Sequence, residues 1–147
     1  MRITLLLFFW FVISSAQTKK IDFFGTEFLV NNACVVKETS IKYNKNAMIW
    51  MEAPPTMLRG MILSTIRNKL AGEKAKEVST NPIKMSLLKQ NWEGKFSQFK
   101  KEGNDSITNF IQLYGNYKDK ERLLILVYKT AKVEQFRLPT YFDFLIK

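Results

Sequence analysis

The side chains in this sequence that could do acid–base chemistry are carboxylates and lysines, because the chain contains no histidine. Histidine is the commonest general base, a usual metal ligand and the base partner in familiar serine and cysteine hydrolases. With a single cysteine, thiolate metal clusters are also excluded, so we expect no metal site. A glycosidase needs only a pair of carboxylates. The candidates for such a pair are Glu52, Glu93, Glu102, Asp105, Asp119 and Glu121.

Four of these carboxylates fall in expected turns beside lysines, which is typical of solvated surface charge. The sequence contains no GxGxxG, GxxxxGK[ST] or GxSxG pattern, so it gives no support to nucleotide binding or to α/β-hydrolase chemistry. We therefore expect a protein that is not an enzyme and that uses no cofactor. A small hydrolase or lyase based on carboxylates and lysine is the alternative.

Trp92 is the one aromatic residue placed where a turn is expected, at 91–94. An exposed ring would stack on a sugar or enter a partner's pocket, whereas a buried ring would cover the sheet, and we favour the buried ring. The lysines near it form a candidate basic patch that would bind anionic polymer less tightly as salt rises. The candidate binding residues are Lys84, Lys89, Trp92, Lys95, Lys100 and Lys101.

The first residues read as a secretory signal peptide. Arg2 is followed by an apolar run from Ile3 to Ile13, and such a run would span roughly 17 Å as a helix, too short for a bilayer core of about 30 Å. Small residues then precede an expected cleavage between Ala16 and Gln17. The sequence thus predicts a signal peptide at 1–16 and one exported domain at 17–147, periplasmic or extracellular. An uncleaved anchor that stops at the lysines of 19–20 is the alternative.

The expected mature chain is basic. Removing 1–16 takes away Arg2 from the 23 Lys and Arg, which leaves 22 against 13 Asp and Glu and a net charge of +9. This excess of positive charge favours a protein partner or an anionic envelope polymer. The sequence contains no nucleic-acid-binding signature, so we expect no nucleic-acid partner. We also expect no stable membrane span after cleavage. Lysines that only keep a small domain soluble are the simpler interpretation. Cys34 stands among small apolar residues and is expected to be buried.

The pattern of residues predicts strands at 21–30, 33–44 and 46–53, where Met48 and Trp50 face one way and Ile49 and Met51 the other. After Thr56, an N-cap, apolar residues recur at helical spacing until Gly72. The expected apolar face consists of Leu58, Met61, Ile62, Ile66 and Leu70, and the opposite strip of Gly60, Ser64, Arg67, Ala71 and Lys74.

The second part of the chain predicts more strands. A strand beginning near Ile83 is followed by a turn at 91–94, a strand at 95–101 and a turn at 102–105. Two long strands at 106–117 and 121–129 then form a hairpin, and the apolar run at 123–127 indicates a central strand covered on both faces. The last segment, 131–147, reads as partly helical around Pro139.

This order of elements predicts an α+β fold, in which an antiparallel β-sheet is packed by one long central helix and a C-terminal helix. The third strand ends in Glu52-Ala53-Pro54-Pro55, the helix follows, the next strand begins near Ile83, and Gly94 lies in a turn before three more strands. In this order the chain resembles the Mog/PsbP-like superfamily. The resemblance implies a mostly non-catalytic domain that binds or stabilises partner proteins, and it transfers no functional residue. A cystatin-like or nuclear-transport-factor-like cone is the rival fold.

Overall fold

The computed structural model describes residues 18–52, 56–117 and 120–145. The expected signal peptide at 1–16, the cleavage site at Ala16 and Gln17, and the candidate carboxylate Asp119 lie outside these residues. The described residues form nine strands, one α-helix and one 3-10 helix. Their bounds are β1 Thr18–Phe23, β2 Thr26–Asn31, β3 Val35–Lys37, β4 Ser40–Tyr43, β5 Asn46–Glu52, α1 Thr56–Ala71, β6 Ala75–Leu87, β7 Gln90–Lys101, β8 Ile107–Tyr117, β9 Lys120–Thr130 and η1 Thr140–Leu145.

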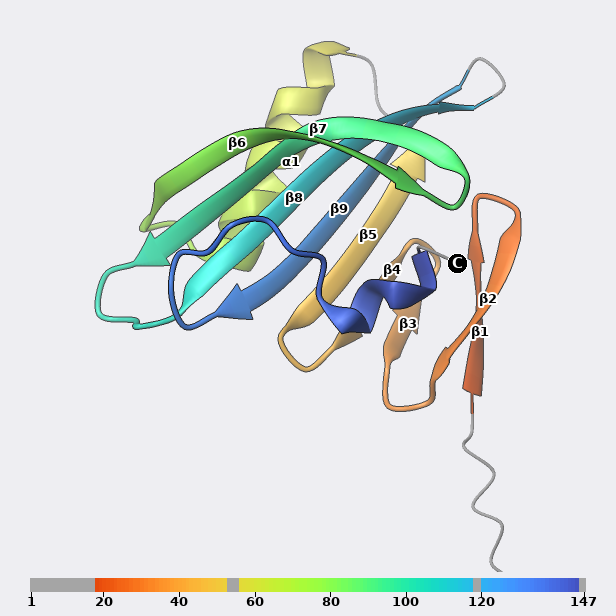
Figure 1. Cartoon of the computed structure of the whole chain (residues 1–147), viewed down its shortest axis with the longest axis horizontal. Coiled ribbons are helices and arrows are strands. Elements are labelled where there is room, and N and C mark those ends of the chain that lie inside the picture. Colours follow the sequence, from red (N-terminus) through yellow and green to blue (C-terminus); the bar gives the residue numbers. More distant parts are fainter. Residues whose placement is uncertain (1–17, 53–55, 118–119, 146–147) are drawn as a thin grey trace, which may run out of the picture.

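Seven of the strands form one antiparallel sheet in the order β3-β4-β5-β9-β8-β7-β6. After β5 the chain crosses through α1 to the far edge of the sheet, and the meander from β6 to β9 then brings β9 back beside β5 (Figure 1). β1 and β2 form a separate two-stranded sheet. The crossover leaves β6 as a long edge strand with α1 behind it.

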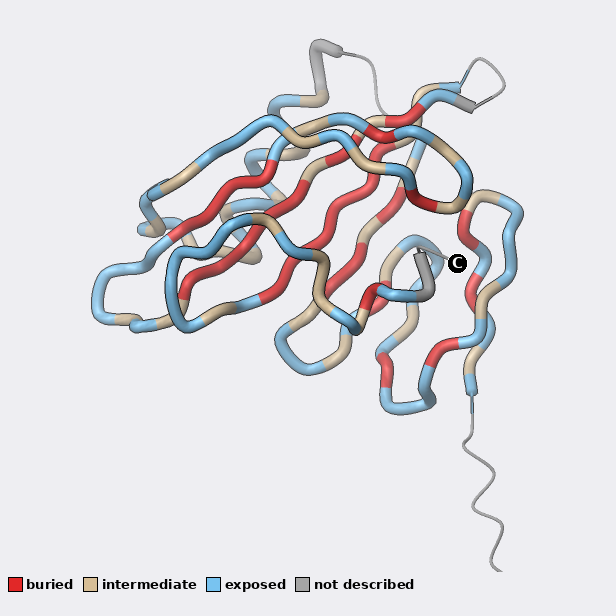
Figure 2. The backbone as a smooth tube through the Cα atoms, viewed as in Figure 1, coloured by how far each residue is buried: buried red, intermediate tan, exposed pale blue. Residues whose placement is uncertain are grey.

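The sheet has two covered faces. One, which we call the hairpin face, packs against β1–β2 and the C-terminal segment, and includes Trp50, Ile111, Leu124 and Leu126. The other, the helix face, packs against α1; its buried residues are Ala47, Phe99, Phe110, Leu123, Ile125 and Val127. Buried positions follow the middle strands, while β6 is mostly exposed (Figure 2).

The central strand confirms the sequence-based prediction for 123–127. Side chains alternate across a strand, so consecutive apolar residues in β9 reach both faces of the sheet. Met48 and Trp50 lie on the hairpin face, and Ile49 and Met51 on the helix face, also as predicted. Cys34 is buried, with its Sγ 3.4 Å from the hydroxyl of Tyr141.

The predicted α+β class is wrong, because strands make up most of the described chain. The expected C-terminal helix is only the six-residue 3-10 helix η1, and 133–139 before it have neither helix nor strand. Pro139 disfavours helix in the preceding residue and cannot donate a backbone hydrogen bond, so helix starts only after it. Helix α1 exists, but it lies on the helix face and none of its described residues 59–71 is buried.

Two boundaries on the β6–β7 hairpin also differ from the prediction. The turn lies at Leu88 and Lys89, whose φ angles of 53° and 59° match a two-residue hairpin turn, so 91–94 belong to β7. β6 begins at Ala75, well before the expected start near Ile83. An edge strand tolerates Pro82 and the register shift between Glu77 and Ser79, which is why the proline did not end the strand.

Helix α1 begins at Thr56 and ends before Gly72, as predicted. Gly72 has a φ of 96°, and its backbone N–H donates to the carbonyl of Asn68, which is a common way to end a helix. The predicted apolar face is confirmed only in part. Ile66 and Leu70 contact the helix-face core as predicted, whereas Met61, assigned to the same face, is 69% exposed. Leu63, which was not assigned to that face, also contacts the core.

Candidate functional site

The structure does not bring the six predicted binding residues into one patch. Lys84 and Lys95 extend from the helix face, where they line clefts beside α1, while Trp92 and Lys100 follow the opposite face of β7. Lys89 lies in the β6–β7 turn, and Lys101 passes its side chain close to Gly72 at the end of α1. Because β7 is 12 residues long, its two ends are about 35 Å apart.

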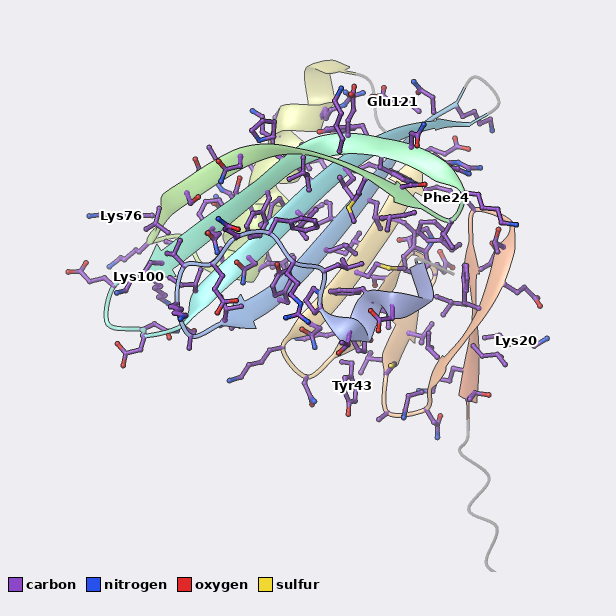
Figure 3. The ribbon with its side chains drawn as sticks, viewed as in Figure 1. Lys20, Phe24, Tyr43, Lys76, Lys100 and Glu121 are labelled. Carbon is purple, nitrogen blue, oxygen red and sulfur yellow. The ribbon has the colours of Figure 1, made fainter. Side chains whose placement is uncertain are left out.

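Lys100 stands directly opposite Lys76 in the β6–β7 register, and both side chains are exposed. Figure 3 shows the two at one end of the sheet, with Glu121 at the other end. Like charges directly opposite each other weaken strand pairing by a few tenths of a kcal/mol. Lys100 and Lys101 therefore lie at the opposite end of β7 from the β6–β7 turn and Lys89, and Lys100 is also on the opposite face from Lys84 and Lys95.

Trp92 is buried against the hairpin face. Its indole Nε1 donates a hydrogen bond of 3.2 Å to the carbonyl of Leu87, and the residue is only 2% exposed. Its ring lies on Gly115 of β8, so closely that a Cβ at that glycine would come within 2.9 Å of it. A ring held in this way cannot stack on a ligand without leaving the core.

A hollow lies beside the sheet, between α1 and strands β6, β7 and β8. Two clefts of about 590 Å³ and about 300 Å³ meet there, because Lys95 and Gln112 line both of them. We call this pair of clefts the α1 groove. Its walls are Arg59, Gly60, Leu63, Ser64 and Arg67 from α1, and Glu77, Thr80, Pro82, Ile83, Lys84, Glu93, Gly94, Lys95, Ser97, Phe99, Phe110, Gln112, Tyr114 and Glu121 from the sheet.

A third cleft of about 880 Å³ continues from the groove toward the β6–β7 turn. It shares four lining residues with the groove, namely Lys84, Glu93, Tyr114 and Glu121, and adds Lys89 from the turn. All three hollows are open rather than enclosed, and their shared walls place them in a row. Such a row suits an extended ligand better than a compact one.

Arg59 anchors α1 over one end of the groove. Its guanidinium forms an ion pair with Glu121 and lies 4.6 Å from the ring centre of Tyr114. Burial raises the pKa of the Tyr114 hydroxyl; the nearby Arg59 charge lowers it, and the Glu121 charge raises it. Arg59 Nε is buried and has no hydrogen-bond partner among the described residues. This cluster ties the helix to the sheet, and burial favours the neutral form of Tyr114.

Lys95 is the central cation of the groove. It extends from the middle of β7, directly opposite Gln112 of β8, and it is exposed. Within the described part of the chain, no carboxylate lies within ion-pair distance of its ammonium group. By contrast, Lys84 pairs with Glu93 at 3.6 Å and Arg59 pairs with Glu121. The groove thus holds an ammonium group that an anionic ligand can reach.

The carboxylates proposed for catalysis lie apart from any buried acid–base cluster. Glu52 pairs with Lys120 at 3.0 Å on the surface, and Glu102 and Asp105 are exposed around the β7–β8 turn. Among the described candidates, Glu93 and Glu121 share a cleft, and their side chains are 71% and 40% exposed. Both side chains are therefore partly open to solvent and are not enclosed together.

The described residues contain neither a metal-binding cluster nor a membrane-spanning helix. No three His, Cys, Asp or Glu side chains in 18–52, 56–117 and 120–145 are grouped so that they could hold a metal ion. In the same ranges no helix has the length and hydropathy to span a bilayer.

Sequence reasoning found Lys84, Lys89 and Lys95 but missed Arg59, Gln112 and Tyr114. The signal for the helix residues was present, because Gly60, Ser64 and Arg67 stood out as a strip of small and polar residues. That strip stood opposite the expected apolar face, whereas in the structure these three residues line the groove together with the sheet. Gln112 and Tyr114 carried no local signal, since only the β7–β8 register places them beside Lys95 and Glu93.

Comparison with protein-family models and with curated proteins found no match to this chain.

Proposed function

We propose that this protein is an exported binding domain without catalytic activity, and that it holds an extended anionic partner in the α1 groove. The observation that carries the proposal is the exposed ammonium of Lys95 at the junction of the two clefts, with no carboxylate partner among the described residues. A net charge of +10 for the whole chain adds a long-range attraction for the same kind of partner. Export is supported by the signal-like sequence at 1–16.

The alternative, a carboxylate-based hydrolase or lyase, has one supporting observation. Glu93, Glu121 and Tyr114 line the same clefts. Both carboxylates, however, already pair with Lys84 and Arg59, and neither is enclosed. An acid–base pair in a hydrolase is held in a water-poor site so that its pKa values separate, and an open groove does not provide such a site. The binding function therefore explains the geometry with fewer assumptions.

The test is binding of the purified protein to immobilised polygalacturonate and to immobilised poly-L-glutamate, two extended polyanions. We expect retention on at least one of them that weakens as salt rises from 50 to about 300 mM, because the Debye length falls below about 10 Å. Lys95→Gln should weaken binding about three- to tenfold, through loss of one charge-assisted hydrogen bond in a partly screened site.

Lys45→Gln is the matched control, since Lys45 is an exposed lysine in the turn between β4 and β5, outside the groove. It changes the net charge by the same amount as Lys95→Gln. Equal effects of the two substitutions would show that only net charge matters and would contradict binding in the α1 groove. Absence of retention on both polymers at 50 mM salt would contradict the proposal as a whole.

A further inference from the structure

The α1 groove contains uncharged polar groups beside its cation. Lys95 and Gln112 are directly opposite in the β7–β8 register and line both clefts. Within the described residues, the Gln112 side-chain amide has no hydrogen-bond partner, and Lys95 has none either. An amide and an ammonium group on directly opposite residues can both donate N–H groups to one ligand. A carboxylate, with two acceptor oxygens, matches that arrangement.

Hydroxyl groups and aromatic rings flank this pair. Thr80 Oγ1 and Ser97 Oγ lie 2.8 Å apart on the sheet, and Ser64 lies across from them on α1. The ring of Tyr114 lines one cleft, and the rings of Phe99 and Phe110 line the other. The hydroxyls of a sugar ring can form hydrogen bonds with the hydroxyl groups of the groove. Its apolar C–H faces can pack on the aromatic rings.

The edge strand beside the groove is poorly suited to an extended peptide. A peptide commonly binds by adding a strand to an open sheet edge, through an unbroken row of backbone groups. In β6 that row is interrupted twice, by Pro82, which has no N–H, and by the register shift between Glu77 and Ser79. A ligand in the groove must therefore be recognised through side chains, which favours a glycan over a peptide.

We propose that the ligand of the α1 groove is a linear glycan that carries carboxylate groups. One uronate carboxylate accepts hydrogen bonds from Lys95 Nζ and from the side-chain amide of Gln112, and the neighbouring sugars lie along the two clefts toward Tyr114 and toward Phe99. This inference rests on the proposed function and adds the chemical class of the ligand.

The experiment compares polygalacturonate, a uronate glycan, with poly-L-glutamate, which has carboxylates on a peptide backbone, and with neutral dextran. We expect the protein to bind polygalacturonate at least about tenfold more tightly than poly-L-glutamate at equal carboxylate concentration, and dextran more weakly than either. Gln112→Leu should weaken polygalacturonate binding about three- to tenfold, through loss of the amide hydrogen bond to the uronate carboxylate.

Gln112→Glu is the second variant. It keeps the size of the side chain and places a like charge beside the uronate, so it should reduce polygalacturonate binding more than Gln112→Leu does. Thermal unfolding of both variants checks that the sheet is intact, and Lys45→Gln again serves as the control for net charge.

Equal or tighter binding of poly-L-glutamate, or unchanged polygalacturonate binding by both Gln112 variants, overturns the glycan inference. If Lys95→Gln still weakens binding in that case, the anionic groove stands and its ligand is an acidic peptide or another polyanion. If Lys95→Gln leaves polyanion binding unchanged, or if the protein binds neither polyanion, the proposed function is overturned and this inference with it.

Discussion

The contact between Trp92 and Gly115 allows a quantitative test of the hairpin-face packing. A Cβ on Gly115 would lie 2.9 Å from Cε3, 3.0 Å from Cδ2 and 3.2 Å from Cζ3 of the indole. Carbon atoms in van der Waals contact lie about 3.5–4.0 Å apart, so Gly115→Ala forces the ring to move. The ring is buried and its Nε1 is bound to the carbonyl of Leu87, so it has little freedom to do so.

We expect Gly115→Ala to lower the free energy of unfolding by about 2–4 kcal/mol. Overpacking of a core by one methyl group costs about 1–3 kcal/mol, and loss of the indole hydrogen bond adds about 1 kcal/mol. Gly60→Ala is the matched control, because nothing lies within 4 Å of a Cβ at that position of α1. Alanine is the better helix former, so this control should stabilise the protein by up to about 1 kcal/mol.

The assay is urea unfolding followed by far-UV circular dichroism, with a double-mutant cycle. Trp92→Phe removes the ring carbons Cε3 and Cζ3, so Gly115→Ala should cost about 1 kcal/mol or less in that background. An effect of Gly115→Ala within about 0.5 kcal/mol of zero would refute the packing described here. The same cost in both backgrounds would show that the strain comes from the backbone of β8 and not from Trp92.

Two further predictions concern pH and processing. Burial, with a smaller contribution from Glu134, raises the pKa of Tyr128 from 10.0 to about 12. The folded state therefore holds this proton more tightly than the unfolded state does. About 2–3 kcal/mol of the free energy of unfolding is thus present below pH 10 and is lost between pH 10 and 12. Tyr128→Phe should lose the hydrogen bond to the Arg137 carbonyl at every pH and show a shallower alkaline decline in urea unfolding; parallel declines would contradict this assignment. The intact mass of the protein from its natural host should correspond to a chain that begins at Gln17, and a chain that begins at Met1 would contradict cleavage after Ala16.

Much of the strand content was predictable from local sequence. The apolar run at 123–127 identified a strand covered on both faces, and the alternation around Met48 and Trp50 identified another, because burial on one or both faces leaves a clear pattern of apolar residues. The start and end of α1 were predictable from Thr56 and Gly72 for the same kind of reason. Short-range backbone preferences decide these features.

Errors arose where local preference competes with position in the sheet. Pro82 usually ends a strand, but an edge strand leaves some N–H groups unpaired and therefore accepts it. The turn at Leu88 and Lys89 has neither Gly nor Asn, so it carried no turn signal. The apolar residues of α1 recur around more than half of the helix, so periodicity alone could not decide that Leu63 faces the sheet while Met61 faces water.

The sequence alone determined that this protein is basic, lacks histidine, carries a signal-like N-terminus and contains long β-strands. Composition and short-range pattern are sufficient for these properties, because they do not depend on which segments meet. The tertiary structure decided which lysines lie together: it joined Lys95 to Gln112 and to α1, and it moved Lys100 to the far end of the sheet. Strand register and the crossover through α1 set those distances, and both result from packing between segments far apart in the chain.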